Sequence, residues 1–76
     1  MLNNVNATRN KLAMLVEDNI FTNKEVMFNN IKIKFTTKNV VIYTIDNGGW
    51  FKELTINADV YQHQIVEYIL LILKLN

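Results

Sequence analysis

The chain has 76 residues, half of them apolar, and eight basic against seven acidic side chains give a formal net charge of +1. A chain of this length forms one small α+β domain, which we place at residues 1–76, and it buries only about 60% of its unfolded surface. It contains no cysteine, which excludes a disulfide framework and a thiolate metal site.

The first predicted element is a helix over about 4–18. Its expected inward side is apolar at helical spacing and consists of Val5, Leu12, Leu15 and Val16. Asn4 or Asn6 is the expected N-cap, because a side-chain amide oxygen accepts hydrogen bonds from the first free backbone amides. Asn19 is the expected left-handed residue at the C-terminal end.

Four short strands joined by three tight turns are predicted between Glu25 and Ile56. Asn29-Asn30 fits a two-residue hairpin turn, since Asn tolerates positive φ. The segment 46–49, Asp-Asn-Gly-Gly, closes the last hairpin. Consecutive hairpins make the strands neighbours, so an antiparallel meander is expected.

The middle turn decides which side chains face inward. Thr37-Lys38-Asn39 fits a three-residue loop with Asn39 left-handed, which pairs Phe35 with Val41. A two-residue loop would place Lys34 opposite Val41 on the face that we expect to be buried, and this register is rejected.

With that register the sheet has an inner and an outer face. The expected inner face consists of Val26, Phe28, Ile31, Ile33, Phe35, Val41, Tyr43, Ile45, Trp50, Leu54 and Ile56, and Lys52 is the one charged residue among them. The expected outer face consists of Glu25, Met27, Lys32, Lys34, Thr36, Val40, Ile42, Thr44, Asp46, Phe51, Glu53 and Thr55.

A second helix is predicted from about Ala58 to Leu75, with Asn57 or Asp59 as its cap. Its expected inward stripe is Tyr61, Ile65, Tyr68, Ile69 and Ile72. The architecture is therefore α-β-β-β-β-α, a four-stranded antiparallel meander with both helices packed on one face.

The last turns of this second helix are apolar nearly all round, which is typical of burial on more than one side. The surplus either packs against the first helix or forms a homo-oligomeric seam, which we prefer because contiguous apolar patches seldom stay exposed on monomers. The expected oligomer contacts are Val66, Leu70, Leu71 and Leu73.

The residues for catalysis are scarce. There is no Ser or Cys and one His, His63, on the expected polar side of the second helix, whereas a catalytic triad needs a nucleophile, a base and an orienting group. One His cannot complete a zinc site, and 46–49 joins two strands rather than a strand and a helix, unlike a phosphate-binding loop. We expect no catalytic residues, no metal and no cofactor.

The outer face is the predicted binding surface. Its expected protein-binding residues are Met27, Lys32, Lys34, Val40, Ile42 and Phe51. Single-stranded nucleic acid is the alternative ligand, since aromatic and lysine side chains on an open sheet can stack bases. Only one aromatic residue, Phe51, is expected there, and acidic residues lie beside it. A plain solvated face that binds no ligand is the other alternative.

The sequence therefore favours a non-enzymatic module that binds another protein as an inhibitor or regulator. The alternatives are a small nucleic-acid-binding regulator and a homo-oligomeric accessory protein. Twelve Asn, nine Ile and seven Lys indicate an AT-rich genome, and in size and composition the chain is similar to phage and mobile-element proteins that block host machinery.

A cytoplasmic location is expected, in the host cell if a phage encodes the protein. The N-terminus lacks the basic start and apolar run of a signal peptide. The longest apolar run, Tyr68 to Leu73, is far shorter than the ~20 residues of a membrane span.

Overall fold

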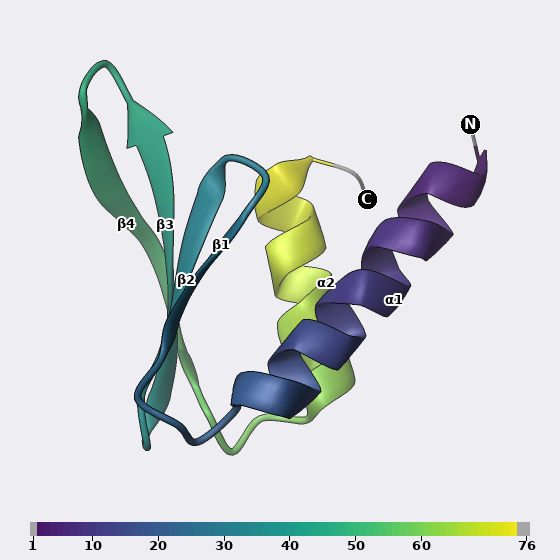
Figure 1. Cartoon of the computed structure of the whole chain (residues 1–76), viewed down its shortest axis with the longest axis horizontal. Coiled ribbons are helices and arrows are strands. Elements are labelled where there is room, and N and C mark those ends of the chain that lie inside the picture. The colour runs from purple at the N-terminus through teal and green to yellow at the C-terminus, as the bar shows by residue number, and fades with distance from the viewer. Residues whose placement is uncertain (1, 75–76) are drawn as a thin grey trace.

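A computed structural model describes residues 2–74, with side chains from residue 5 onward, and has two helices on one face of a four-stranded antiparallel sheet (Figure 1). The elements in chain order are α1 (Leu2–Asn19), β1 (Glu25–Phe28), β2 (Ile31–Phe35), β3 (Asn39–Asp46), β4 (Gly49–Asn57) and α2 (Gln62–Leu73). Each strand pairs with the next along the chain. This confirms the predicted α-β-β-β-β-α meander.

The helix α1 begins earlier and ends differently than predicted. It starts at Leu2, so Asn4 and Asn6 lie within the helix and do not cap it. Beyond its C-terminus the left-handed residue is Phe21, with φ 65°, instead of Asn19. The Asn19 carbonyl accepts a hydrogen bond from the Thr22 hydroxyl at 2.6 Å, which turns the chain toward β1.

The helix α2 begins four residues later than predicted, because the preceding residues form a turn. The Asn57 side-chain oxygen accepts the Asp59 amide at 2.8 Å, and its carbonyl accepts the Val60 amide at 3.1 Å. Both bonds direct the backbone away from the helical path at this point. The helix ends at Leu73 with Lys74 in the left-handed conformation, φ 61°; the predicted end, Leu75, lies outside the described residues.

One hydrophobic core joins the sheet to both helices. Its buried members are Leu12, Val16, Ile31, Ile33, Phe35, Val40, Ile42, Ile56, Ile65, Val66, Ile69 and Leu70. The inward side predicted for α1 is confirmed by Leu12 and Val16. In the stripe predicted for the second helix, however, Tyr61, which precedes α2, and Tyr68 are exposed, because α2 turns its 65, 66, 69 and 70 positions to the core.

The register between β2 and β3 differs from the predicted one by one residue. Phe35 lies opposite Val40, not Val41, because Thr37-Lys38 is a two-residue turn. The Thr36 hydroxyl oxygen stabilises this turn by accepting the amides of residues 38 and 39 at 3.2 and 2.8 Å. Asn39 consequently does not adopt the left-handed conformation. The rejected two-residue loop is the one that forms.

This shift reverses the two faces of β3. Val40 and Ile42 are completely buried beneath the helices, whereas Tyr43 and Ile45 lie on the outer face. Val41 is also on the outer face, where it pairs with Lys34. It is nevertheless buried as expected, with 8% of its surface exposed. The segment 40–45 is apolar at both parities, so hydrophobicity did not distinguish them.

A bulge in β4 restores the predicted orientation over half of that strand. Leu54 pairs with Ile42 and Lys52 with Tyr43, which leaves Glu53 as the extra residue. An extra residue reverses the alternation of side chains on its strand. Leu54 therefore faces the core as predicted, while Trp50, opposite Ile45, turns outward.

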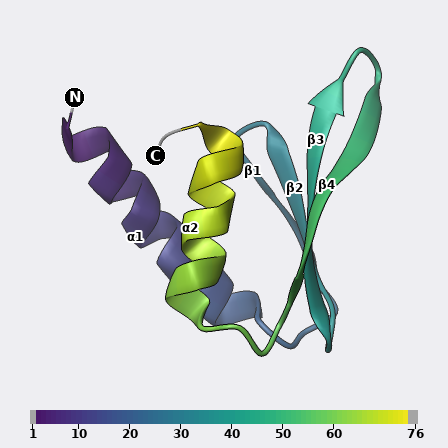
Figure 2. The same ribbon diagram turned by 180° about the vertical axis from the view of Figure 1, so that it is seen from behind.

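The end of the β3–β4 hairpin projects past the end of α2 (Figures 1 and 2). Phe51 lies opposite Thr44, which in turn pairs with the buried Ile31, so its side chain is on the helix side of the sheet. Beyond the helix it lacks cover and is 53% exposed.

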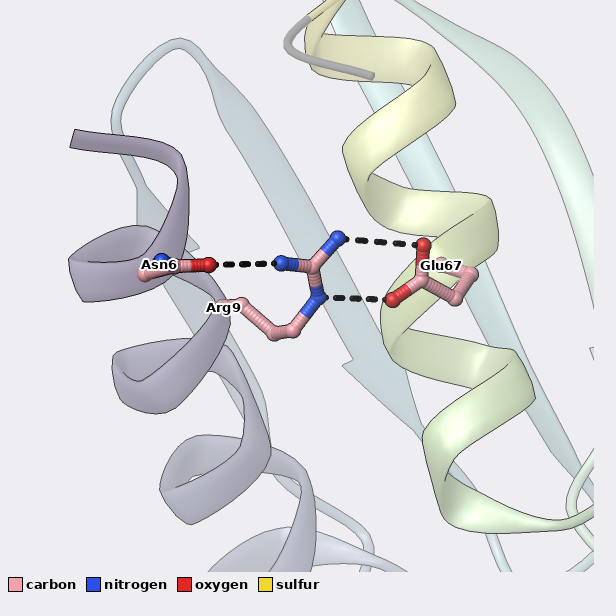
Figure 3. A network of polar contacts seen from close by, with 3 residues as sticks. All are labelled: Asn6, Arg9 and Glu67. Atoms are coloured by element: carbon pink, nitrogen blue, oxygen red, sulfur yellow. Dashed lines mark hydrogen bonds and ion pairs between the residues drawn. The ribbon is translucent and has the colours of Figure 1, made fainter. Parts of the chain in front are cut away.

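An ion pair links the two helices (Figure 3). The Arg9 guanidinium donates to both carboxylate oxygens of Glu67, at 2.8 and 3.4 Å, and to the Asn6 amide oxygen at 3.1 Å. These hydrogen bonds lower the pKa of the Glu67 carboxyl below its ordinary value and raise the pKa of the Arg9 guanidinium. The contact lies on the helix side, remote from the outer sheet face.

Candidate functional site

The outer face of the sheet carries a row of four side chains across all four strands. Cross-strand pairing aligns Met27, Lys32, Tyr43 and Lys52 in that order. Tyr43 therefore lies between two lysines, each its direct neighbour. Cross-strand neighbours on one face lie within side-chain contact of each other, so this row combines one ring with two positive charges.

Two further rows flank the central one. On one side Glu25, Lys34, Val41 and Thr55 are aligned across the sheet. On the other side Ile45 lies opposite Trp50. Rows on one face are two residues apart along a strand, about 7 Å, so the three rows form one continuous surface.

Lys32 connects the two aromatic rings. Its Nζ lies 4.9 Å from the centroid of the Trp50 ring and 5.2 Å from that of Tyr43, both within the range of cation–π attraction. Since β3 lies between β2 and β4, the Lys32 and Trp50 side chains meet above β3. The indole is thus held across the sheet and remains 37% exposed.

The outer face is more basic than the sequence indicated. Lys32, Lys34 and Lys52 are on it, with Glu25 as its one acidic residue among the described strands. A carboxylate oxygen of Glu25 lies 3.9 Å from the Lys32 Nζ, a long ion pair that contributes little to stability.

The other two acidic residues expected on this face are elsewhere. Glu53 accepts a hydrogen bond from the Thr44 hydroxyl at 2.7 Å on the helix side. Asp46 follows the outward Ile45 in β3 and so faces the helix side as well. The shifted register thereby removes two negative charges from the outer face.

Three of the six predicted protein-binding residues lie where they were expected. Met27, Lys32 and Lys34 are on the outer face. Val40 and Ile42 are core residues, so they are unable to contact a partner. The burial of Val40 and Ile42 differs from the prediction because Thr37-Lys38 forms a two-residue turn. The position of Phe51 on the helix side has the same cause.

The sequence prediction missed Tyr43, Trp50 and Lys52 as surface residues. A signal was present in Thr36, since a Thr that begins a tight turn often bonds the amides two and three residues on. Lys52 was a second signal, because it was the one charged residue on the predicted inner face.

The predicted oligomer contacts on α2 divide into two pairs. Val66 and Leu70 belong to the core of this chain, so they do not form the oligomer contacts that the sequence suggested. Leu71 is exposed, and Leu73 is half-buried against the core. The apolar surplus of α2 is thus used largely within the chain.

The one histidine of the chain, His63, lies in the first turn of α2. His63 is exposed and stacks on Tyr61, with ring centroids 5.6 Å apart. Within residues 2–74 no three His, Asp or Glu side chains cluster as metal ligands, and no pocket is found. The exposed rings and lysines of the outer face are what the described residues offer for recognition.

In the described part of the chain, neither helix combines the length and the apolar character needed to span a bilayer. Comparison with protein-family models, curated proteins and solved structures finds no match to this chain.

Proposed function

We propose that this protein is a non-enzymatic binding module that holds single-stranded nucleic acid on the outer face of its sheet. The observation that carries the proposal is the juxtaposition of Tyr43 and Trp50 with Lys32 and Lys52 on one open face. Every nucleobase has a π-face that stacks on aromatic side chains, and lysines neutralise the phosphates between bases.

Charge favours nucleic acid over the protein partner that the sequence suggested. The outer face has three lysines against one glutamate, although the whole chain has a net charge of only +1. A positive face complements a phosphate backbone and attracts it over a distance of about a Debye length.

Binding of a labelled oligothymidylate, measured by fluorescence anisotropy, tests the proposal. Between about 50 and 200 mM salt the affinity should fall, with a log–log slope of about −0.7 for each phosphate neutralised on a single strand. Lys52→Ala should make that slope shallower by about 0.7. Trp50→Ala should weaken binding by about 1–3 kcal/mol, the contribution of one stacked base.

Tyr68→Ala is the matched control, because Tyr68 is an exposed aromatic on α2, away from the outer face. It should leave the affinity unchanged. Absence of binding, or binding that is independent of both salt and Trp50, would contradict the proposal.

An inhibitor or regulator that binds another protein is the second candidate. Met27 and Ile45 favour this candidate, because they are exposed apolar side chains on the same face and base stacking does not require them. A complex formed by apolar burial would persist at high salt and be weakened by Ile45→Ala, which changes no charge, whereas phosphate binding would weaken steeply with salt.

A homo-oligomeric accessory protein is the third candidate, with Leu71 and Leu73 as its remaining contacts. Light scattering of the wild type and of Leu71→Lys tests it. A mass of 8.9 kDa for both proteins would remove this candidate.

A further inference from the structure

The Lys32 ammonium covers the surface on which a base would stack. It lies over both the Tyr43 and the Trp50 ring, and the attraction between cation and ring has to be broken before a base takes its place. The Tyr43 and Trp50 rings together form the stacking platform. When no ligand is bound, the Lys32 ammonium therefore already occupies it.

The displaced ammonium has little else to bind on the protein. Among the described residues its one charged partner is Glu25, at 3.9 Å. A pair of this length is weak and does not compensate for the lost ring contacts. A phosphate brought in by the ligand would compensate, since an ammonium forms a strong charge-assisted hydrogen bond with it.

On the basis of the proposed function, we infer that Lys32 makes the Tyr43–Trp50 platform select ligands that carry phosphate over uncharged aromatic ligands. A neutral aromatic compound has to remove the ammonium from the rings and gives it no partner. A nucleotide strand provides a base for the rings and an anion for the ammonium. Lys32 thereby couples stacking to phosphate recognition, which an ordinary surface lysine would not do.

Lys34 provides a matched control. It is on the same strand and the same face, two residues from Lys32, and is exposed. Within the described part of the chain, Lys32 is the lysine that contacts aromatic rings, and Lys34 does not. Removing either residue takes one positive charge from the face, but only removal of Lys32 uncovers the rings.

The test compares two oligothymidylates of about eight nucleotides, a length within the usual site size of a single-strand-binding domain. One has the natural phosphodiester backbone and the other an uncharged methylphosphonate backbone. Lys32→Ala should bind the uncharged strand about threefold more tightly than the wild type, because the cation–π cover is gone. The same variant should bind the phosphodiester strand more weakly.

The controls separate this effect from a general loss of charge. Lys34→Ala should weaken phosphodiester binding and leave the uncharged strand unaffected. Lys32→Arg should keep the wild-type preference, since guanidinium also binds rings and phosphate. If thermal unfolding shows that Lys32→Ala does not fold, Lys32→Gln keeps most of the stem and takes its place.

The outcomes distinguish this inference from the proposed function. If wild type binds the phosphodiester strand but Lys32→Ala gains nothing for the uncharged one, the selective role of Lys32 is wrong and nucleic-acid binding stands. If wild type binds neither strand, both are overturned.

Discussion

Ile33 of β2 lies directly opposite Ile42 of β3, and both side chains are completely buried. Because side chains alternate between the two faces of a strand, the inward position of Ile42 determines on which face each neighbouring β3 side chain lies. With Ile42 turned inward, Tyr43 is turned outward, next to Lys32. The core and the candidate site thus depend on the same register.

Replacing Ile42 and Ile45 one at a time tests the register. Ile42→Ala removes a completely buried side chain and should lower the free energy of unfolding by about 2–5 kcal/mol. Ile45→Ala, in the same strand but 54% exposed, should change it by less than about 0.5 kcal/mol. Urea denaturation measures both, and the reverse order would support the register predicted from the sequence.

Much of the fold was predictable because its determinants are local. The turns at Asn29-Asn30 and 46–49 each contain a residue with positive φ, Asn29 at 54° and Asn47 at 34°. The β1–β2 register and the strand order follow from them. The apolar pattern could not decide between a two-residue and a three-residue loop at Thr37-Lys38, since β3 has apolar residues on both of its faces.

The last hairpin turn gives a test of backbone conformation alone. Gly48 has φ +94°, and a Cβ there would meet nothing within 4 Å; the space around Gly49 is equally open, without a positive φ. Gly48→Ala should therefore destabilise the protein by about 1 kcal/mol through strain. Gly49→Ala should be neutral or stabilise it by up to about 1 kcal/mol. Equal effects in thermal unfolding would disagree with this turn geometry.

Two adjacent leucines on α2 test how that helix is oriented. Leu70 is completely buried and Leu71 is exposed. Leu70→Ala should lower the free energy of unfolding by about 2–5 kcal/mol, from lost burial and the cavity left behind. Leu71→Ala should be nearly neutral. A large effect of Leu71→Ala would instead indicate that this side chain is covered, as in a homo-oligomer.

The Arg9–Glu67 pair predicts a dependence of stability on pH. Since the pKa of Glu67 is lower in the folded protein than in the unfolded chain, the pair stabilises the fold at pH values above the pKa that Glu67 has in the unfolded chain. That stabilisation is lost as the pH falls through the folded-state pKa. Glu67→Gln should therefore be less stable than wild type at neutral pH and equal to it in strong acid.

Glu17→Gln is the control for this titration, because Glu17 is exposed and forms no ion pair with a described residue. It should be no less stable than wild type at neutral pH, because it loses no such ion pair and removes a negative charge from the C-terminal end of α1. A gap between Glu67→Gln and wild type that is the same at neutral and acidic pH would show that hydrogen bonding or packing, and not charge, is responsible.

The candidate site was less predictable than the fold because it depends on two details that the apolar pattern of β3 and β4 does not decide. The first is the one-residue shift at Thr37-Lys38, which exchanges Val40 and Ile42 for Tyr43 and Ile45 on the outer face. The second is the bulge at Glu53, which lets Leu54 face inward while Trp50 faces outward. The Thr36 hydroxyl, which accepts the amides of residues 38 and 39, is a local signal for the first detail, but the apolar pattern marks neither of them.

An NMR titration of the ¹⁵N-labelled protein with oligothymidylate tests the central claim most directly. The account predicts that the largest shifts occur at the Trp50 indole and at the amides of Lys32 and Tyr43, with the α2 amides around Tyr68 unchanged. Shifts confined to the helices, or none at saturating ligand, would contradict binding of single-stranded nucleic acid on the outer face of the sheet.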